Sequence, residues 1–264
     1  MCSIFCILDI KTGADALRPK ALEYSRLLRH RGPDWSGIYN NEHAILVHER
    51  LSIVDTEHGA QPLYSSDRKL VLAVNGEIYN HKILSSQHTP DYDFQTASDC
   101  EIIIPMYEKF GRDFVDKLQG MFAFCLYNER DNSYLIARDH MGIIPLYTGY
   151  DDEGNFYVAS EMKALMPICK TVAEFPPGHI LDSRVGKLEK YYQRNWQKYS
   201  AIKDNNTSKE KLREALEDSV KSHLMTDVPY GVLLSGGLDS SLISAITQKF
   251  AARRIEENDL SEAW

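Results

Sequence analysis

The sequence predicts an α+β fold in which two antiparallel sheets pack together and helices cover their outer faces, followed by the start of an α/β region. Short apolar runs separated by turn residues fill the chain as far as Tyr192, and the pattern changes beyond it. Helical spacing occurs in only two segments before that point. The runs that predict strands are 3–10, 44–54, 70–75, 121–127, 134–137 and 156–159.

The residues between these runs predict that many neighbouring strands are antiparallel. Asn75-Gly76 and 152–154 are typical of hairpin turns, and 129–132 is a polar break between two apolar runs. Apolar residues at helical spacing predict helices over 17–29 and 98–110. The first domain is therefore a mixture of sheets and helices.

A second domain is predicted after a polar linker. Thr207 and Glu210 have the spacing of a capping box, and the apolar stripe that follows predicts about five helical turns. Residues 230–234 predict a buried strand that runs into a glycine loop, with a helix from Asp239 onward. Such a strand normally belongs to a larger parallel sheet, so this domain is expected to look cut short. The predicted limits are 2–192 for the first domain, 193–206 for the linker and 207–264 for the second domain.

Composition excludes several classes of protein. Of 264 residues, 43% are hydrophobic, which is enough for a packed core, so a disordered chain is excluded. Lys and Arg number 30 against 38 Asp and Glu, a net charge of −8 with no long basic run, so neither nucleic acid nor a membrane is an expected partner. The start of the sequence has no basic signal region, which predicts a cytoplasmic protein. The five cysteines contain no C-x-x-C pair, so a disulfide framework or zinc site is not expected.

Cys2 is the first candidate for chemistry. When the initiator Met is removed, Cys2 carries a free α-amine beside its own thiol. An α-amine has an ordinary pKa of about 7.7–8.0, so it can act as the base that activates this nucleophile. The alternative is a small buried apolar residue on the first strand.

Three further positions have a functional and a structural interpretation. Arg50 lies in an apolar strand, where it either grips a carboxylate or faces water at a sheet edge. Asn75 and Gly76, followed by Glu77, offer an amide and an unshielded N–H for an oxyanion and a carboxylate for an ammonium, or they form a plain hairpin turn. Asp99 either binds a ligand or serves as a first-turn acid of a helix.

The glycine loop over 235–241 is a more specific signal. Small residues between a buried strand and a helix N-terminus let backbone N–H groups converge on an anion, although the lysine of a Walker A motif is absent. Asp239 either reaches a Mg²⁺ carried by phosphates or caps the helix. An ordinary glycine turn is the alternative.

The motifs together resemble a known family, the class II glutamine amidotransferases, and with the 235–241 loop they resemble the glutamine-hydrolysing asparagine synthetases. The resemblance covers essentially the whole chain, in the family's order. It is carried by the segments 1–5, 29–34, 50–55, 75–80, 120–124, 138–139 and 235–241.

This resemblance implies an N-terminal-nucleophile hydrolase fold, an αββα sandwich, in which Cys2 attacks the side-chain amide of L-glutamine. It implies that Asn75 and the Gly76 N–H hold the oxyanion, and that the hydrolysis needs no cofactor. Arg50 and backbone near Ile53 would bind the substrate α-carboxylate, and Glu77 and Asp99 its α-ammonium. In the complete protein the ammonia would reach a second site, where ATP and Mg²⁺ activate L-aspartate for asparagine formation. Nucleotide binding is implied for Leu233, Ser235, Gly236, Gly237, Leu238, Asp239 and Ser240, with Asp239 as the metal ligand.

The sequence departs from the family pattern in two respects. Ser3 and Cys6 stand where the family usually has glycine, and the chain ends well before the family's synthetase domain does. Two alternatives stay open: another class II amidotransferase, against which the 235–241 loop argues, and a non-catalytic binding or regulatory fragment. A homodimer is a further open expectation.

Overall fold

The computed structural model describes residues 1–258, with side chains through residue 251. By its internal contacts the chain divides into two units, Met1–Gln193 and a second unit from Arg194 onward. The limits 2–192, 193–206 and 207–264 that the sequence suggests for domains and linker stay a prediction.

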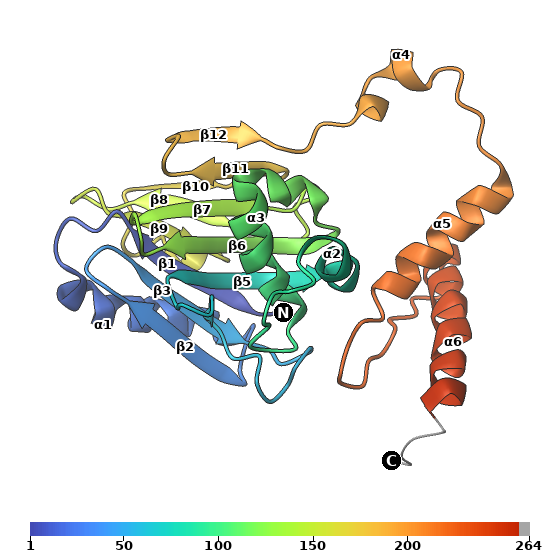
Figure 1. The fold of residues 1–264 in the computed structure, drawn as a ribbon, viewed down its shortest axis with the longest axis horizontal. Coiled ribbons are helices and arrows are strands. Elements are labelled where there is room, and N and C mark those ends of the chain that lie inside the picture. Colours follow the sequence, from blue (N-terminus) through green and yellow to red (C-terminus); the bar gives the residue numbers. More distant parts are fainter. Residues whose placement is uncertain (259–264) are drawn as a thin grey trace. The chain divides into compact units, whose positions relative to one another are not determined.

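The first unit contains two six-stranded sheets in which all strand pairs are antiparallel (Figure 1). Sheet A has the order β10-β8-β9-β1-β3-β2 and sheet B the order β12-β11-β7-β6-β5-β4. The strands of sheet A are β1 (Ser3–Leu8), β2 (Trp35–Asn40), β3 (Ile45–Arg50), β8 (Tyr147–Tyr150), β9 (Phe156–Ala159) and β10 (Thr171–Glu174). Those of sheet B are β4 (Leu63–Tyr64), β5 (Leu70–Ile78), β6 (Gly120–Asn128), β7 (Ser133–Arg138), β11 (His179–Asp182) and β12 (Lys187–Lys190).

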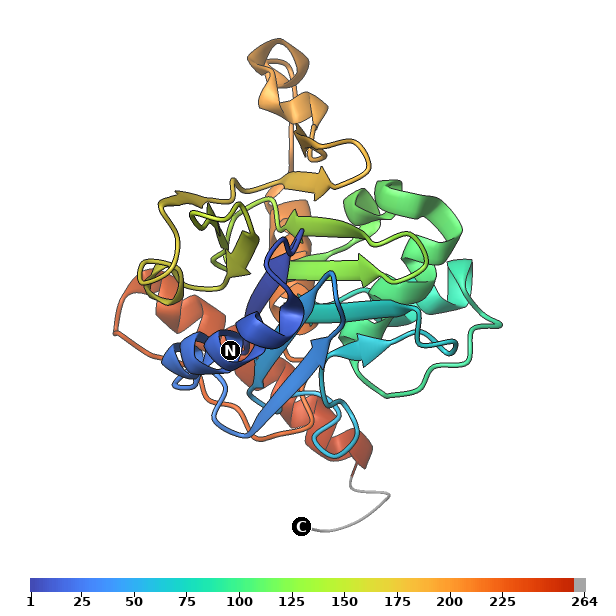
Figure 2. The ribbon, with the colours of Figure 1, turned by 90° about the vertical axis from the view of Figure 1, so that its left-hand side faces the viewer.

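Helices cover the outer face of each sheet (Figure 2). α1 (Ala14–Ser25) packs on β1 and β3 of sheet A, with the short helix η1 (Arg26–Leu28) after it. The outer face of sheet B is covered mainly by α3 (Ile103–Phe110) and its flanking turns. The layer order is therefore helix, sheet, sheet, helix, as predicted. The other helices of this unit are α2 (His81–His88), η2 (Asp99–Ile102), η3 (Gly111–Lys117) and η4 (Met162–Ala164).

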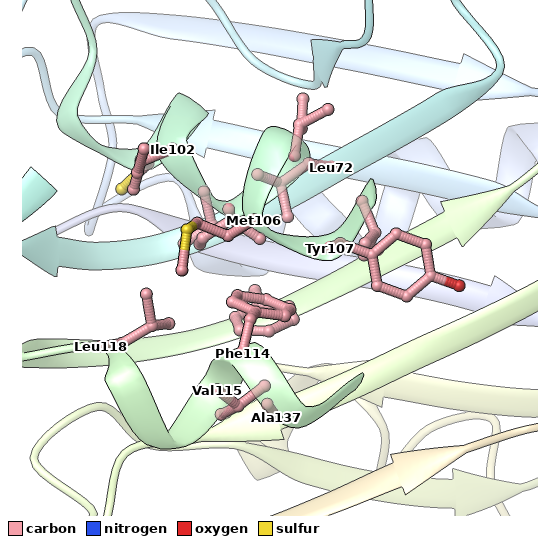
Figure 3. Close-up of a cluster of buried hydrophobic side chains, with 14 of the residues drawn as sticks. Leu72, Ile102, Met106, Tyr107, Phe114, Val115, Leu118 and Ala137 are labelled. Carbon is pink, nitrogen blue, oxygen red and sulfur yellow. The ribbon is translucent and has the colours of Figure 1, made fainter. Parts of the chain in front are cut away.

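Three apolar clusters hold the layers together. One lies between the two sheets, one between sheet A and α1, and one between sheet B and α3 (Figure 3). Because strand side chains alternate between faces, the central strands contribute to two clusters each. On β1, for example, Ile4 and Cys6 point into the space between the sheets, while Phe5 and Ile7 point toward α1.

The predicted strands are confirmed in place, with corrections at their ends. The 44–54 run ends as a strand at Arg50, because residues 51–59 wrap around that side chain instead. Asn75-Gly76 is not a hairpin turn: β5 continues to Ile78 and stays paired with β6 throughout. The turns at 129–132 and 152–154 are confirmed as connections between antiparallel neighbours.

The second unit, within the described residues, is helical. Its elements are η5 (Asn195–Gln197), α4 (Tyr199–Ile202), α5 (Lys209–Ser222) and α6 (Leu238–Asn258). The expected capping box is wrong by one residue, because Ser208 caps α5 and accepts the Lys211 N–H. The expected strand at 230–234 does not form, and Leu233 is 95% exposed. A single strand has no ladder without neighbours, and the described residues of this unit supply none.

Candidate active site

A pocket opens where β1, β3 and β5 end at one side of the space between the sheets. All seven residues predicted to handle glutamine line it. They are Cys2, Arg50, Ile53, Asn75, Gly76, Glu77 and Asp99. The side-chain alternation explains the convergence: Arg50 shares its face of β3 with Leu46, and Asn75 shares its face of β5 with Ala73, and both of those residues lie between the sheets.

Cys2 is held at the start of β1 by its neighbours. Its sulfur accepts the Leu51 N–H at 3.3 Å and lies 3.4 Å from the Leu51 carbonyl oxygen, while Arg31 Nε donates to the Cys2 carbonyl at 3.1 Å. Burial raises the pKa of the Cys2 thiol. A thiol that stays protonated at neutral pH needs a base to become a nucleophile. Met1 lines the same pocket, directly beside the thiol.

Arg50 organises the loop that forms one wall of the pocket. The residue is buried, and its guanidinium donates to the carbonyl groups of Val54, Asp55 and Thr56. The Asp55 carboxylate extends this scaffold, because it accepts the Ala97 N–H at 2.8 Å in the segment that leads to Asp99. The alternative of an edge-strand arginine in water is wrong, since β3 lies between β1 and β2.

The edge of β5 carries the two candidate oxyanion donors. The Phe122 N–H and C=O are both engaged with Asp139, on the side of β6 away from β5, so the Gly76–Phe122 pair makes no ladder bonds. The Gly76 N–H therefore faces the pocket. Only glycine fits here, because φ is +151° and an added Cβ would lie 2.1 Å from the Met121 oxygen.

Asn75 is buried, and among the residues that the structure describes neither its Nδ2 nor its Oδ1 has a hydrogen-bond partner. An unpaired buried amide destabilises the folded chain by about 1–3 kcal/mol. Such a group is retained where a ligand satisfies it, and here it faces the same pocket as Cys2. Asn75 Nδ2 and the Gly76 N–H are therefore the two candidate oxyanion donors of this pocket.

Two carboxylates, Glu77 and Asp99, also line the pocket. Asp99 lies in the first turn of η2, yet its Oδ2 accepts the Ile78 N–H of β5 at 2.6 Å. Burial raises the pKa of Asp99, and burial together with the Asp99 charge raises the pKa of Glu77 to about 7. Both acids resist ionisation because burial and their mutual repulsion disfavour the charged forms. A bound ammonium group would stabilise the charged forms, so the pair is a suitable partner for it.

Sequence reasoning missed several residues that shape the pocket, among them Leu51, Gln61 and Cys100. The Cys100 thiol lies 3.4 Å from the Gly76 carbonyl oxygen. No sequence signal distinguishes these residues, because Leu51 and Gln61 come from loops whose course depends on tertiary contacts, and Cys100 is one of the apolar positions in η2. His48 could have been noticed, since it is a polar residue two positions before Arg50 and on the same face of an apolar strand.

The predicted nucleotide residues are in the second unit and are described separately. Leu233 through Asp239 are exposed, Gly236 has φ +85°, and α6 begins at Leu238. The hydroxyl oxygens of Ser235 and Ser240 lie 3.0 Å apart. Small residues, hydroxyls and a helix N-terminus fit a phosphate group chemically, although the strand expected to frame them is absent. In the described part of the chain, no three His, Cys, Asp or Glu side chains gather as for a metal ion.

Comparison with known proteins agrees with this geometry. Residues 1–197 match the glutamine amidotransferase domain, and the chain belongs to that family. Residues 211–257 match a second family, asparagine synthase. The chain is 64% identical over 264 residues to asparagine synthetase B [glutamine-hydrolyzing] of Escherichia coli K12, and 47% identical over 270 residues to a probable asparagine synthetase [glutamine-hydrolyzing] of Dictyostelium discoideum. Both alignments cover 100% of this chain but 48% of the relative, so the chain spans about half their length.

A solved structure supports the fold. The glutamine phosphoribosylpyrophosphate amidotransferase of Bacillus subtilis matches with a TM-score of 0.61 and 22% sequence identity, over 73% of this chain and 50% of that one. This likeness supports the sandwich of two sheets between helices as the fold of the first unit. Separately, none of the helices in residues 1–258 is long and apolar enough to cross a membrane.

Proposed function

We propose that the first unit hydrolyses L-glutamine to glutamate and ammonia, with Cys2 as the nucleophile. The observation that carries the proposal is the buried, unpartnered Asn75 amide beside the Gly76 N–H, in the pocket that contains the Cys2 thiol. These are the three parts that acyl transfer requires: a nucleophile, an oxyanion hole and room for a substrate carbonyl.

The chemistry begins after removal of Met1, which frees the Cys2 α-amine. This amine takes the thiol proton while the sulfur bonds to the side-chain carbonyl carbon of glutamine. The carbonyl π electrons move to oxygen, where Asn75 Nδ2 and the Gly76 N–H stabilise the charge. When the tetrahedral species collapses, the C–N bond breaks and the amine returns the proton to the departing ammonia. Water then attacks the thioester by the same route, which yields glutamate and restores the thiol.

The rest of the pocket recognises the amino-acid end of glutamine. Arg50 and backbone near Ile53 are positioned to receive the α-carboxylate. Glu77 and Asp99 receive the α-ammonium. The substrate thereby spans the space between the Arg50 loop and the edge of β5, with its amide next to Cys2.

In the complete protein we propose that this ammonia is used to convert L-aspartate to asparagine with ATP. The 235–241 loop would hold phosphate groups, Leu233 would contact the adenosine, and Asp239 would bind Mg²⁺. The asparagine synthase match over 211–257 supports this proposal. A homodimer and a cytoplasmic location belong to the same proposal.

A glutaminase assay on the purified chain tests the proposal and separates it from its alternatives. We expect glutamate release by the native chain, and glutamine binding without turnover by Cys2→Ala, because no other nucleophile adjoins an α-amine. A chain that binds glutamine without turning it over would instead be a binding or regulatory fragment. Hydrolysis by Cys2→Ala at the native rate would show that the nucleophile is assigned wrongly.

A further inference from the structure

The open edge of β5 is completed by side chains where a neighbouring strand is missing. β4 pairs only with Val71 and Leu72, so within residues 1–258 the edge of β5 beyond Leu72 has no strand beside it. The even-numbered residues of β5 direct their backbone groups to this edge, as the Gly76–Phe122 register requires. Gly76 is one of them, and it presents its N–H to the pocket.

Val74, the next residue in this row, is held on both of its backbone groups. Gln61 Oε1 accepts the Val74 N–H at 2.9 Å, and His48 Nε2 lies 3.0 Å from the Val74 carbonyl oxygen. A carbonyl can only accept, so Nε2 carries the proton and His48 is a neutral donor. The lowered pKa of about 3, which burial causes, keeps this imidazole neutral at physiological pH.

His48 crosses from one sheet to the other. It lies on β3 of sheet A, is fully buried, and shares its face of the strand with Arg50. Val74 lies on β5 of sheet B and directly precedes Asn75, one of the oxyanion donors. The bond between them fixes β5 relative to the strand that carries the substrate-binding arginine.

We propose that His48 and Gln61 are positioning residues that hold Val74, and through it the Asn75 amide and the Gly76 N–H, in the geometry of the oxyanion hole. The proposal rests on the glutamine hydrolysis proposed above. An oxyanion hole owes its effect to donors that are fixed before the charge develops. A small displacement of this strand should therefore reduce turnover more than substrate binding.

The test compares four variants, with kcat and KM for glutamine as the first readout. In His48→Leu and Gln61→Met we expect kcat to fall about tenfold or more, with KM within about twofold of the native value. His48→Gln keeps an N–H donor and should recover most of the loss. The matched control is Ser65→Ala: Ser65 Oγ accepts the Leu70 N–H at 2.9 Å, a similar side-chain bond on the same edge but far from Gly76. Ser65→Ala should keep the native kcat.

Two further readouts separate positioning from general damage. Alkylation of Cys2 by iodoacetamide forms an S–C bond and expels iodide without developing an oxyanion, so its rate should be unchanged in His48→Leu. Hydrogen exchange of the β5 amides from Val74 to Ile78 should accelerate in His48→Leu and Gln61→Met, but not in Ser65→Ala. Hydrogen exchange does not depend on activity. A native chain without glutaminase activity would contradict the proposed function, and the exchange rates would still test whether His48 and Gln61 position β5.

Three results would overturn the inference. They are native kcat in His48→Leu, an equal loss of kcat in Ser65→Ala, and alkylation that slows in parallel with kcat. Should His48→Leu fail to fold, Gln61→Met decides by the same criteria, since it removes the acceptor on the other side of Val74.

Discussion

At the scale of single residues, the proposed roles separate substrate binding, assigned to Arg50, from the chemical step, assigned to Asn75. Arg50→Leu should raise KM for glutamine roughly 10- to 100-fold, because hydrogen bonds to charged groups contribute about 1.5–3 kcal/mol. Asn75→Ala should instead lower kcat by about 10² to 10³, as expected for the loss of one oxyanion donor. Steady-state kinetics of both variants provides the measurement. Equal effects of both substitutions on both parameters would contradict the assigned roles.

If Glu77 receives the substrate ammonium as proposed, glutamine binding should depend on pH. The pKa of Glu77 is raised to about 7, first by burial and then by the Asp99 charge, so below this pH the side chain is protonated and neutral. A neutral acid attracts the substrate ammonium less, so affinity should rise as the pH increases through about 7. Equilibrium binding of glutamine to the Cys2→Ala protein between about pH 6 and about pH 8 isolates this effect from catalysis. Affinity that stays flat over this range would argue against Glu77, and Glu77→Gln should bind weakly with no such dependence.

At the scale of elements, the alternation of apolar residues located the central strands of both sheets. In the structure, Cys2, Arg50 and Asn75 come to the space between the sheets, because side chains alternate between faces along β1, β3 and β5. The short outer strands could not be predicted from this pattern. A segment such as β12 (Lys187–Lys190) has little apolar character and forms only because β11 pairs with it. The Asn75-Gly76 turn was wrong for a related reason: pairing with β6 along its whole length keeps β5 extended.

The contacts by which Gln61 and Asp55 hold the site in place could not be predicted from the sequence. Gln61 and Asp55 are in loops, and nothing in their spacing shows that one reaches Val74 and the other Ala97. The sequence leaves open whether Asp99 binds a ligand or is a first-turn acid of a helix. In the structure Asp99 lies in the first turn of η2, and its carboxylate accepts a backbone N–H of β5. Such contacts depend on tertiary structure, which periodicity does not encode.

The segment 203–208, which precedes α5 in the second unit, should be the part of the chain most susceptible to proteases. Residues 203–208 are exposed, and they lie between the short helix α4, which ends at Ile202, and α5, which begins at Lys209. Limited proteolysis should cut between Lys203 and Ser208 and release an N-terminal piece that retains glutaminase activity. Mass spectrometry of the fragments, with an assay of the purified piece, provides the check. Early cleavage within Met1–Gln193, or an inactive piece, would contradict the independence of the first unit.

At the scale of the whole molecule, these 264 residues should carry out the glutaminase half alone. The buried strand predicted at 230–234 does not form, and Val232, Leu233 and Leu234 are exposed. Without that frame, the N–H groups of the 235–241 loop are not preorganised toward phosphate. We expect weak or undetectable ATP binding by calorimetry and no asparagine formed from aspartate. ATP-dependent asparagine formation by the purified chain would contradict this expectation.

The central claim is that the freed α-amine of Cys2 activates its own thiol, and a removable N-terminal extension tests it most directly. The chain would carry a leader that a specific protease removes immediately before Cys2, with intact mass confirming each form. Before cleavage the Cys2 nitrogen is an amide that cannot accept a proton, so we predict no glutaminase activity. After cleavage we predict activity equal to that of the native chain. Full activity with the leader still attached would contradict the account.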